Sequence, residues 1–421
     1  MNLLVKNGRV VDPARKMDIV TDILIRDGKI RSIGKIDNAD VPKFDATGFV
    51  VAPGFFDIHV HLREPGTEEA ETIATGGAAA VAGGFVAVAA MPNTKPPNDN
   101  PSITAYICAE ARRASPALVF PIGAITKEQK GETLAEIGEM VEAGIAGISD
   151  DGKPVMDGRL FRRALEYAQL FDLPVIQHCE DLNLSRGGVM NEGAMSTRLG
   201  LKGMPAAAED TMVSRDLILA EMTGGKYHVA HLSTRRAVEM VRAAKAQGMK
   251  ITAEVTPHHF TLTDAAVSEY DTNAKMNPPL RTQDDVNALH AGVTDGTIDV
   301  IASDHAPHHV NLKMLEFDRA PFGITGLETA VGLALTQLKL SLSRAIELFS
   351  LNPQKIMRVQ KWGIFEGSDA HLTILDPGRQ WKFDVTRSRS KSRNSPFDGW
   401  QLKGKAVGTI VGGRVVYEDR N

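Results

Sequence analysis

The chain has 421 residues, of which 43% are hydrophobic, with 48 Lys and Arg against 52 Asp and Glu. At about 150 residues per domain this length suits two or three domains, and it excludes a small disulfide-stapled fold. The formal net charge of -4 provides no basic surface for nucleic acid or an anionic membrane, so we expect neither as a partner.

Cys108 and Cys179 are the only cysteines, so no disulfide framework exists and we expect a cytoplasmic protein. The first residues lack the charged and apolar regions of a signal peptide. The uncharged stretch 76–93 is long enough to raise the question of a membrane span, but Ala and Gly dominate it and Gly83-Gly84 interrupts it. It predicts a buried helix followed by a buried strand.

Both ends of the chain have the pattern of β-hairpins. Asp27-Gly28 and Gly412-Gly413 suit tight turns in which both central residues have positive φ. The β-rich segments that flank these turns are 22–26, 29–33, 408–411 and 414–417. Each end is too small to bury a core alone, so we expect residues 1–50 and 362–421 to form one composite β-sandwich.

The middle of the chain, residues 51–361, alternates short apolar runs with helical-looking stretches. The apolar runs span 55–61, 85–91, 117–123, 145–149, 174–178, 227–231, 251–255 and 299–303. Strands that are apolar throughout and alternate with helices indicate a parallel sheet covered on both faces. Eight such units over about 300 residues favour an α/β fold with a (β/α)8 TIM barrel over an open sheet.

One run of basic residues stands out at 387–393, with the sequence Arg-Ser-Arg-Ser-Lys-Ser-Arg. We interpret it as a solvated loop that returns the chain to the sandwich. A nucleic-acid patch is the alternative, and the lack of interleaved aromatic residues argues against it.

Histidines and carboxylates gather at the predicted C-terminal ends of the strands, where barrel enzymes carry their functional residues. These residues are His59, His61, Asp150, Asp151, His178, His231 and Asp304. Alternate residues of a strand face the same way, so His59 and His61 can bind one cation. A single histidine at such a position could equally be a core residue, but four of them at strand ends predict a metal site.

The ligand types predict the metal and the chemistry. Imidazole and carboxylate without cysteine suit zinc or a similar divalent ion. Five or six ligands exceed what one tetrahedral zinc uses, so two ions that share a bridging carboxylate and a bridging hydroxide fit better. Such a pair can polarise a carbonyl and hold a hydroxide at neutral pH, which indicates hydrolysis or its reverse.

Longer motifs in the same regions carry a family resemblance. They are DIHVHLREPG at 57–66, MPNT at 91–94, ISDDG at 148–152, HCED at 178–181, HLST at 231–234, NPPLR at 277–281, SDHAPH at 303–308 and APFGI at 320–324. With these motifs in this order over essentially the whole chain, the sequence resembles the class I bacterial dihydroorotases of the amidohydrolase superfamily. The resemblance implies reversible cyclisation of N-carbamoyl-L-aspartate to L-dihydroorotate and water, in de novo pyrimidine biosynthesis.

The resemblance also implies the ligands of two Zn2+ ions per chain. One ion would be held by three residues and the other by two, with Asp151 bridging them. These residues are His59, His61 and Asp304 for the first ion, and His178 and His231 for the second.

The bridge separates this family from its relatives. Hydantoinases and allantoinases use a carboxylated lysine at the end of the fourth strand, whereas Ser149-Asp150-Asp151 here matches the bacterial dihydroorotases. Lys153 lies two residues beyond, in a turn that contains glycine. The sequence leaves the bridge open between Asp150, Asp151 and a carboxylated Lys153.

Substrate and product both carry a carboxylate on the ring-forming carbon, so the site needs a fixed cationic donor. Arg63, two residues beyond His61, is placed to supply it. Asn93 and Asn277 stand beside prolines, so each could be a turn residue instead of a substrate contact. The further substrate contacts that the resemblance implies are His61, Asn93, Asn277, His308, Phe322 and Gly323.

Asp304 is the predicted catalytic residue. In hydrolysis the hydroxide attacks the ring carbonyl, and Asp304 accepts the hydroxide proton and then delivers it to the leaving amide nitrogen. Cyclisation is the reverse and consumes a protonated state, so acidic conditions favour it. The polar loop 309–321 follows the eighth strand, and we interpret it as a lid that closes over substrate.

Two other functions compete with this one. A hydantoinase or allantoinase type of cyclic amidohydrolase is disfavoured by Arg63, Asn93 and the Asp-containing fourth strand. An inactive scaffold for aspartate carbamoyltransferase would lack metal ligands, and all of them are present here. We expect a homo-oligomer, and an active enzyme in complex with the transferase remains open.

Overall fold

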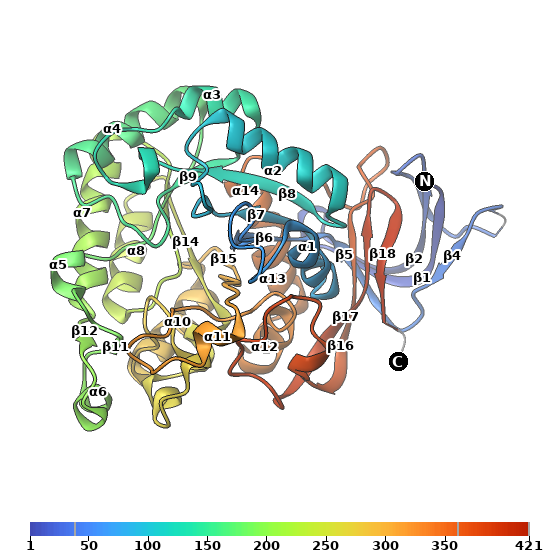
Figure 1. Ribbon diagram of the computed structural model, residues 1–421. Coiled ribbons are helices and arrows are strands. Elements are labelled where there is room, and N and C mark those ends of the chain that lie inside the picture. The colour runs from blue at the N-terminus through green and yellow to red at the C-terminus, as the bar shows by residue number, and fades with distance from the viewer. Residues whose placement is uncertain (38, 360–361, 420–421) are drawn as a thin grey trace.

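The computed structural model describes residues 1–37, 39–359 and 362–419. Its largest part is a barrel of parallel strands, and a second sheet with strands from both ends of the chain packs beside it (Figure 1). The barrel strands are β6 Phe55–Val60, β7 Phe85–Ala90, β8 Leu118–Gly123, β9 Gly147–Ser149, β10 Val175–Gln177, β13 Tyr227–Val229, β14 Ile251–Val255 and β15 Val300–Ile301.

The barrel strands pair in chain order from β6 to β15. A parallel bridge between Val60 and His305 joins β6 to the segment that follows β15, so the sheet closes on itself. Each of the eight apolar runs contains one of these strands, and the prediction of a (β/α)8 barrel is confirmed. Closure brings the C-terminal ends of all eight strands to one rim of the barrel.

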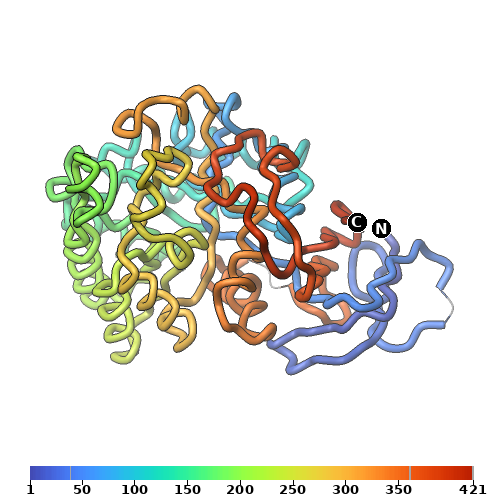
Figure 2. Tube along the Cα trace, turned by 90° about the horizontal axis from the view of Figure 1, so that it is seen from below, coloured from blue at the N-terminus to red at the C-terminus, as the bar shows by residue number. Residues whose placement is uncertain are grey.

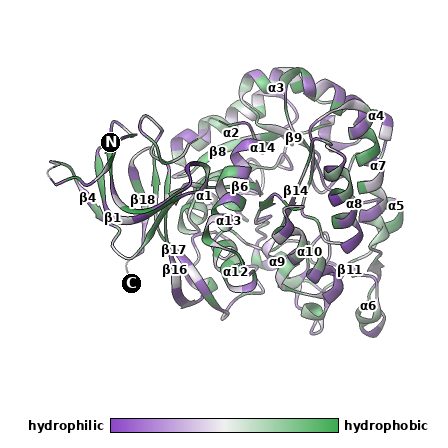
Figure 3. Ribbon diagram, turned by 180° about the vertical axis from the view of Figure 1, so that it is seen from behind, coloured by the Kyte–Doolittle hydropathy of each residue, from purple (hydrophilic) through white to green (hydrophobic). Residues whose placement is uncertain are grey.

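Helices surround the barrel and carry both hydrophilic and hydrophobic residues (Figure 3). In α4, for example, Leu160, Phe161, Ala164 and Leu165 are buried at the spacing of one helical face. The longer helices are α1 Ile73–Ala82, α2 Pro101–Ala114, α3 Ile137–Ala143, α4 Gly158–Ala168, α7 Ala207–Thr223, α8 Arg235–Ala246, α10 Gln283–Asp295 and α12 Ala330–Gln337. The shorter helices are α5 Leu182–Ser185, α6 Ala194–Leu199, α9 Pro257–Thr261, α11 Val310–Lys313, α13 Leu342–Ile346 and α14 Asn352–Ile356.

The uncharged stretch 76–93 forms most of α1 and all of β7, as the sequence predicts. The helix begins after Thr72, whose side chain accepts a hydrogen bond from the backbone N–H of Thr75. Among the described residues, no helix is long and apolar enough to cross a membrane.

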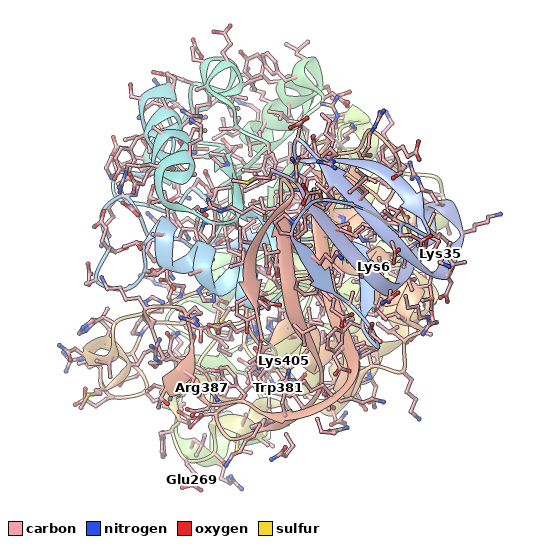
Figure 4. All side chains as sticks on the ribbon, turned by 90° about the vertical axis from the view of Figure 1, so that its right-hand side faces the viewer. Lys6, Lys35, Glu269, Trp381, Arg387 and Lys405 are labelled. Carbon is pink, nitrogen blue, oxygen red and sulfur yellow. The ribbon has the colours of Figure 1, made fainter. Side chains whose placement is uncertain are left out.

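The second sheet combines strands from both ends of the chain, which lie side by side in Figure 4. Its order is β18-β17-β16-β5-β1-β2-β3, and β4 pairs with β1. Its core contains Val5, Ile23, Leu372 and Ile410, so neither end buries this core alone. The strands are β1 Leu3–Asp12, β2 Met17–Arg26, β3 Lys29–Gly34, β4 Lys43–Asp45, β5 Val50–Pro53, β16 Leu372–Lys382, β17 Gln401–Val411 and β18 Arg414–Glu418.

Both predicted hairpins are present in this sheet. Asp27 and Gly28 join β2 to β3 with φ of 51° and 77°, and Gly412 and Gly413 join β17 to β18 with φ of 56° and 76°. The exact division into residues 1–50 with 362–421 and 51–361 stays a prediction, because residues 360–361 and 420–421 lie outside the described residues.

The basic run 387–393 differs from the solvated loop that we expected. Its arginines and its lysine are exposed, whereas Ser390 and Ser392 are buried. Arg387 lies at the same edge of the molecule as Trp381 and Lys405, whose ammonium group is 4.9 Å from the Trp381 ring (Figure 4). The chain is extended here, so alternate side chains face solvent and protein, and composition alone did not reveal the buried side.

Candidate metal centre and ligand pocket

Two histidines at the end of β6 face the carboxylates of Asp151 and Asp304. The Nε2 atom of His59 lies 3.4 Å from Asp151 Oδ1 and 3.6 Å from Asp304 Oδ1. The Nε2 atom of His61 lies 3.5 Å from Asp151 Oδ2 and 3.0 Å from Asp304 Oδ1. Both imidazoles point to one place, as expected for alternate residues of a strand.

Two further histidines approach Asp151 from the other side. His178 follows β10 and His231 follows β13, and His178 Nδ1 lies 2.9 Å from His231 Nε2. Their distances to Asp151 Oδ1 are 3.9 Å and 3.5 Å. Asp151 is therefore within 4 Å of four histidines. Together with Asp304, these residues form three groups of three that could hold a metal ion, and the ligand atoms of each group lie within 4.8 Å of one another.

The donor atoms fit a divalent cation. Among the described residues, His59 Nε2 and Asp151 Oδ1 are buried and have no hydrogen-bond partner. A buried polar atom without a partner costs free energy, and a cation between imidazole and carboxylate groups would remove that cost. Burial raises the pKa of Asp151, but His59 and His231 outweigh it and hold this pKa well below its usual range.

Asp150 and Lys153 point elsewhere. Asp150 Oδ1 accepts hydrogen bonds from the backbone N–H groups of Ile125, at 2.8 Å, and Thr126, at 3.1 Å. Burial raises the pKa of Asp150 to about 6. The Lys153 side chain is exposed. Of the three residues that the sequence left open, the structure places only Asp151 among the histidines.

A buried carboxylate on β14 holds the far side of His59. Glu254 Oε1 lies 2.5 Å from His59 Nδ1, and Glu254 Oε2 lies 3.2 Å from His228 Nε2. Burial raises the pKa of Glu254, but His59 and His228 outweigh it, so the pKa is far below its ordinary value. Such a partner fixes which nitrogen of His59 is free to bind a metal. Glu254 is not among the site residues predicted from the sequence, although a charged residue in an apolar strand is a signal for one.

Other second nitrogens have partners as well. His61 Nδ1 lies 2.8 Å from Asn93 Oδ1, and His178 Nε2 lies 2.8 Å from Glu180 Oε2. Asn277 Nδ2 donates to the same oxygen of Glu180 at 2.8 Å. Asn93 and Asn277, predicted as substrate contacts, therefore also connect to the histidines, and Glu180 is a further residue that the sequence analysis did not assign.

Asp304 has a constrained backbone, with φ of 43°. The preceding residue, Ser303, donates its backbone N–H to Asp57 at 3.1 Å and 3.0 Å. Asp57 also accepts the backbone N–H of His59, so it ties the first barrel strand to the eighth. Burial raises the pKa of Asp304, but His59 and His61 outweigh it and keep it below the ordinary value. The carboxylate is ionised at neutral pH and can accept a proton.

Arg63 and His308 lie side by side next to this centre. Arg63 has φ of 61°, and its Nε donates to the Pro307 carbonyl at 3.0 Å. Burial lowers the pKa of Arg63 to about 10, which leaves the guanidinium charged at neutral pH. Burial and the Arg63 charge lower the pKa of His308 to about 2, so this imidazole is neutral and donates from Nε2 to the Phe322 carbonyl at 2.7 Å.

A cavity of about 200 Å3 opens over the metal-ligand cluster. It is lined by His61, Arg63, Asn93, Asp151, Gly152, His178, His231, Met276, Asn277, Asp304, Ala306, His308 and Phe322. All the predicted substrate contacts except Gly323 are in this lining. Gly323 lies directly behind it, where a Cβ atom would be 2.6 Å from the Ala306 carbonyl oxygen.

The loop 309–321 is held by two buried lysines. Lys275 Nζ donates to the carbonyls of Phe317, at 2.5 Å, and Ala320, at 2.6 Å. Lys313 Nζ donates to the carbonyls of Pro321, at 2.9 Å, and Gly323, at 3.2 Å. These contacts fix the end of the loop that brings Phe322 to the cavity. Closure over a ligand stays a prediction.

Comparisons with known proteins agree with this geometry. A family model described as Dihydro-orotase-like matches residues 48–237. The chain is 53% identical to a dihydroorotase from Solibacter usitatus, covering 98% of this chain and 97% of the relative. It is 52% identical to a dihydroorotase from Syntrophotalea carbinolica, covering 99% of each.

Solved structures of related enzymes share the fold. An L-hydantoinase from Arthrobacter aurescens has a TM-score of 0.89 at 25% identity, covering 100% of this chain and 97% of the other. A D-hydantoinase from Thermus sp. has a TM-score of 0.84 at 26% identity, covering 99% and 95%. With full-length identity of about one half to the dihydroorotases and a shared barrel with the hydantoinases, the chain belongs to the dihydroorotase family of the amidohydrolase superfamily.

Proposed function

We propose that this chain is a class I dihydroorotase, which interconverts N-carbamoyl-L-aspartate and L-dihydroorotate in pyrimidine biosynthesis. The observation that carries the proposal is Asp151, which follows the fourth barrel strand and lies within 4 Å of four histidines. The full-length similarity to proteins named dihydroorotase supports the same activity.

The donor set supports two Zn2+ ions per chain. One ion would take His59, His61 and Asp304 as ligands, the second would take His178 and His231, and Asp151 would bridge them. When bound, such ions polarise a carbonyl oxygen and lower the pKa of water to near neutrality. The partnerless His59 Nε2 and Asp151 Oδ1, among the atoms described, support this assignment.

Arg63 provides the charge that recognises the substrate. Its guanidinium lies half-buried in the cavity wall and keeps its charge, so it can bind the substrate carboxylate. Asn93 and Asn277 line the same cavity and can donate to carboxylate, ureido or ring amide oxygens. The neutral His308 also lines it, and because its Nε2–H is donated to the Phe322 carbonyl, its Nδ1 is left to accept a hydrogen bond from a substrate N–H. The backbone of Phe322 and Gly323 forms the cavity wall next to His308.

Asp304 moves the proton. In hydrolysis it accepts a proton from the attacking water while the carbonyl carbon becomes tetrahedral, and it then gives this proton to the ring nitrogen as the C–N bond breaks. Its 3.0 Å contact with His61 and its constrained backbone keep the carboxylate at the cavity floor. In the reverse direction the same carboxylate returns the proton as the ring closes and water leaves.

A substrate panel tests the proposal. The purified, zinc-loaded chain is assayed with dihydroorotate, N-carbamoyl-L-aspartate, hydantoin and allantoin. We expect turnover of the first two alone, with N-carbamoyl-L-aspartate consumed faster at acidic pH. Turnover of hydantoin or allantoin without dihydroorotate would contradict the proposal, and a chain that binds metal but turns over nothing would support the inactive scaffold instead.

Assembly also stays a prediction. We propose a homo-oligomer that can also bind aspartate carbamoyltransferase, and gel filtration with and without the transferase tests it. A shift of the chain to a larger species with the transferase is expected, and separate elution of both proteins at micromolar concentration contradicts this partner.

A further inference from the structure

The extended segment 388–395, here called the serine strap, connects the outer sheet to the ligand pocket. It lies between the short 3-10 turn Val385–Arg387 and β17, in the red part of the chain that extends over the barrel in Figure 2. Its basic side chains face solvent, whereas Ser390, Ser392, Asn394 and Ser395 are buried. The buried side of the strap therefore contacts the barrel rim.

Two glutamates, the buried Glu71 and the half-buried Glu328, anchor the first half of the strap. Glu328 accepts hydrogen bonds from the Ser388 hydroxyl and from the backbone N–H of Arg389, the latter at 2.8 Å. Glu71 accepts hydrogen bonds from the Ser390 hydroxyl and from the backbone N–H of Lys391, the latter at 3.1 Å. Hydrogen bonds to a carboxylate are among the stronger ones, so these contacts fix the path of the strap over the rim.

Near the end of the strap, the Asn394 side chain makes three hydrogen bonds to backbone groups. Its Nδ2 group donates to the carbonyls of Ala306 and Gly323, both at 3.0 Å. Its Oδ1 accepts the backbone N–H of His308 at 3.0 Å. The two donor hydrogens and the acceptor of one amide are all used.

These three bonds join two separate stretches of pocket wall. Ala306 and His308 follow the eighth barrel strand, whereas Gly323 follows the loop 309–321. Without Asn394, the Ala306 carbonyl and the His308 backbone N–H would have to find other partners, whereas the Gly323 carbonyl would keep its hydrogen bond from Lys313 Nζ. The two stretches are also joined directly, by the Ala306 N–H to the Ile324 carbonyl at 2.9 Å and by His308 Nε2 to the Phe322 carbonyl at 2.7 Å. Asn394 adds three further bonds that help to set the spacing between the stretch that carries His308 and the stretch that carries Phe322.

We propose that Asn394 is a positioning residue for substrate recognition, which acts through His308 and the Phe322-Gly323 backbone. The inference rests on the proposed dihydroorotase function for its kinetic consequence. The hydrogen bonds of the Asn394 side chain go to Ala306, His308 and Gly323, none of which is a candidate metal ligand. The second nitrogens of His59, His61 and His178 have other partners, in Glu254, Asn93 and Glu180. Loss of its amide therefore affects substrate binding more than metal binding or proton transfer.

Two variants with a matched control test the inference. Asn394→Asp places an acceptor against the carbonyls of Ala306 and Gly323, and Asn394→Ala removes the side chain. Arg389→Ala changes an exposed side chain of the same strap and serves as the control. We expect the Asn394 variants to raise KM for dihydroorotate by about tenfold or more, with kcat changed less than about threefold. The reason is that the lost hydrogen bonds hold the residues that bind substrate, and not the candidate metal ligands or Asp304.

Two readouts separate this role from general destabilisation and from failure of the proposed function. Metal content per chain is expected to equal that of the wild type. Nitrogen-15 NMR of labelled histidines is expected to show a shifted His308 signal in both Asn394 variants, even if the wild type does not act on dihydroorotate. An unchanged His308 signal, an unchanged KM, or metal loss that accompanies an equal fall in kcat would overturn the inference.

Discussion

The two walls of the cavity are built differently. The metal-ligand wall comes from the ends of barrel strands, and three of its four histidines have a second partner, which is Glu254 for His59, Asn93 for His61 and Glu180 for His178. The recognition wall consists of loops, in which Arg63 has a positive φ and the 306–308 and 322–323 stretches are tied together by Asn394. Regular strand pairing positions the chemistry, whereas long-range side-chain contacts position the substrate.

The largest expected effect comes from the metal-ligand wall, at Asp304. Asp304→Asn keeps the shape and an oxygen donor but removes the proton acceptor, so kcat should fall by about 10³-fold or more. The measurement is kcat for dihydroorotate hydrolysis with metal content determined on the same sample. A variant that retains a tenth of wild-type kcat would place the proton transfer on another residue.

The next effect comes from the recognition wall. Arg63→Met keeps much of the side-chain volume but removes the charge that faces the substrate carboxylate, so kcat/KM should fall by about 10²-fold or more. The loss should appear mainly in KM, while both metals remain bound. If metal content fell as much as kcat/KM, Arg63 would support the metal centre as well as substrate binding, and the two walls would not have separate roles.

A smaller effect is expected behind the metal-ligand wall, at Glu254. Glu254→Gln keeps a hydrogen-bond acceptor for His59 but removes the charge, so metal affinity should weaken by about 10- to 100-fold. Competition with a metal chelator measures this affinity without any need for turnover. Glu239→Gln, at an exposed position on α8, is the control and should leave the affinity unchanged.

The smallest effect concerns stability below the centre, where Asp216 is buried on α7. Burial raises its pKa to about 7, so the folded state disfavours the ionised form. Its contribution is favourable below the unfolded pKa and is lost as pH rises through about 7. Between pH 5 and pH 7 the free energy of unfolding should therefore fall by about 2 kcal/mol, and Asp216→Asn should abolish this fall. Urea unfolding at both pH values measures it, and parallel pH dependence in wild type and variant would contradict it.

The barrel and the candidate metal ligands could be predicted from sequence because both follow local patterns. Each barrel strand is an apolar run of its own, and His59-Val60-His61 places two imidazoles on one side of a strand without any knowledge of the fold. The hairpin turns at Asp27-Gly28 and Gly412-Gly413 were equally local, because their φ values are a property of the turn itself.

The residues that hold the site in place, such as Asn394 and Glu254, could not be predicted in the same way. Asn394 lies 86 positions from His308 in sequence, and its role depends on a strap that composition marked only as a basic run. Glu254 and His59 are 195 positions apart and meet only when the barrel closes. The choice among Asp150, Asp151 and Lys153 required the direction of each side chain, which adjacent positions in a turn do not reveal.

The most direct test of the account is the metal content of the wild type, Asp151→Ala and Lys153→Ala, measured per chain on zinc-loaded protein. We predict two zinc ions in the wild type and in Lys153→Ala, and a loss of bound zinc in Asp151→Ala, because Asp151 is the carboxylate within 4 Å of all four histidines. One ion per wild-type chain, or zinc loss in Lys153→Ala with retention in Asp151→Ala, would contradict it.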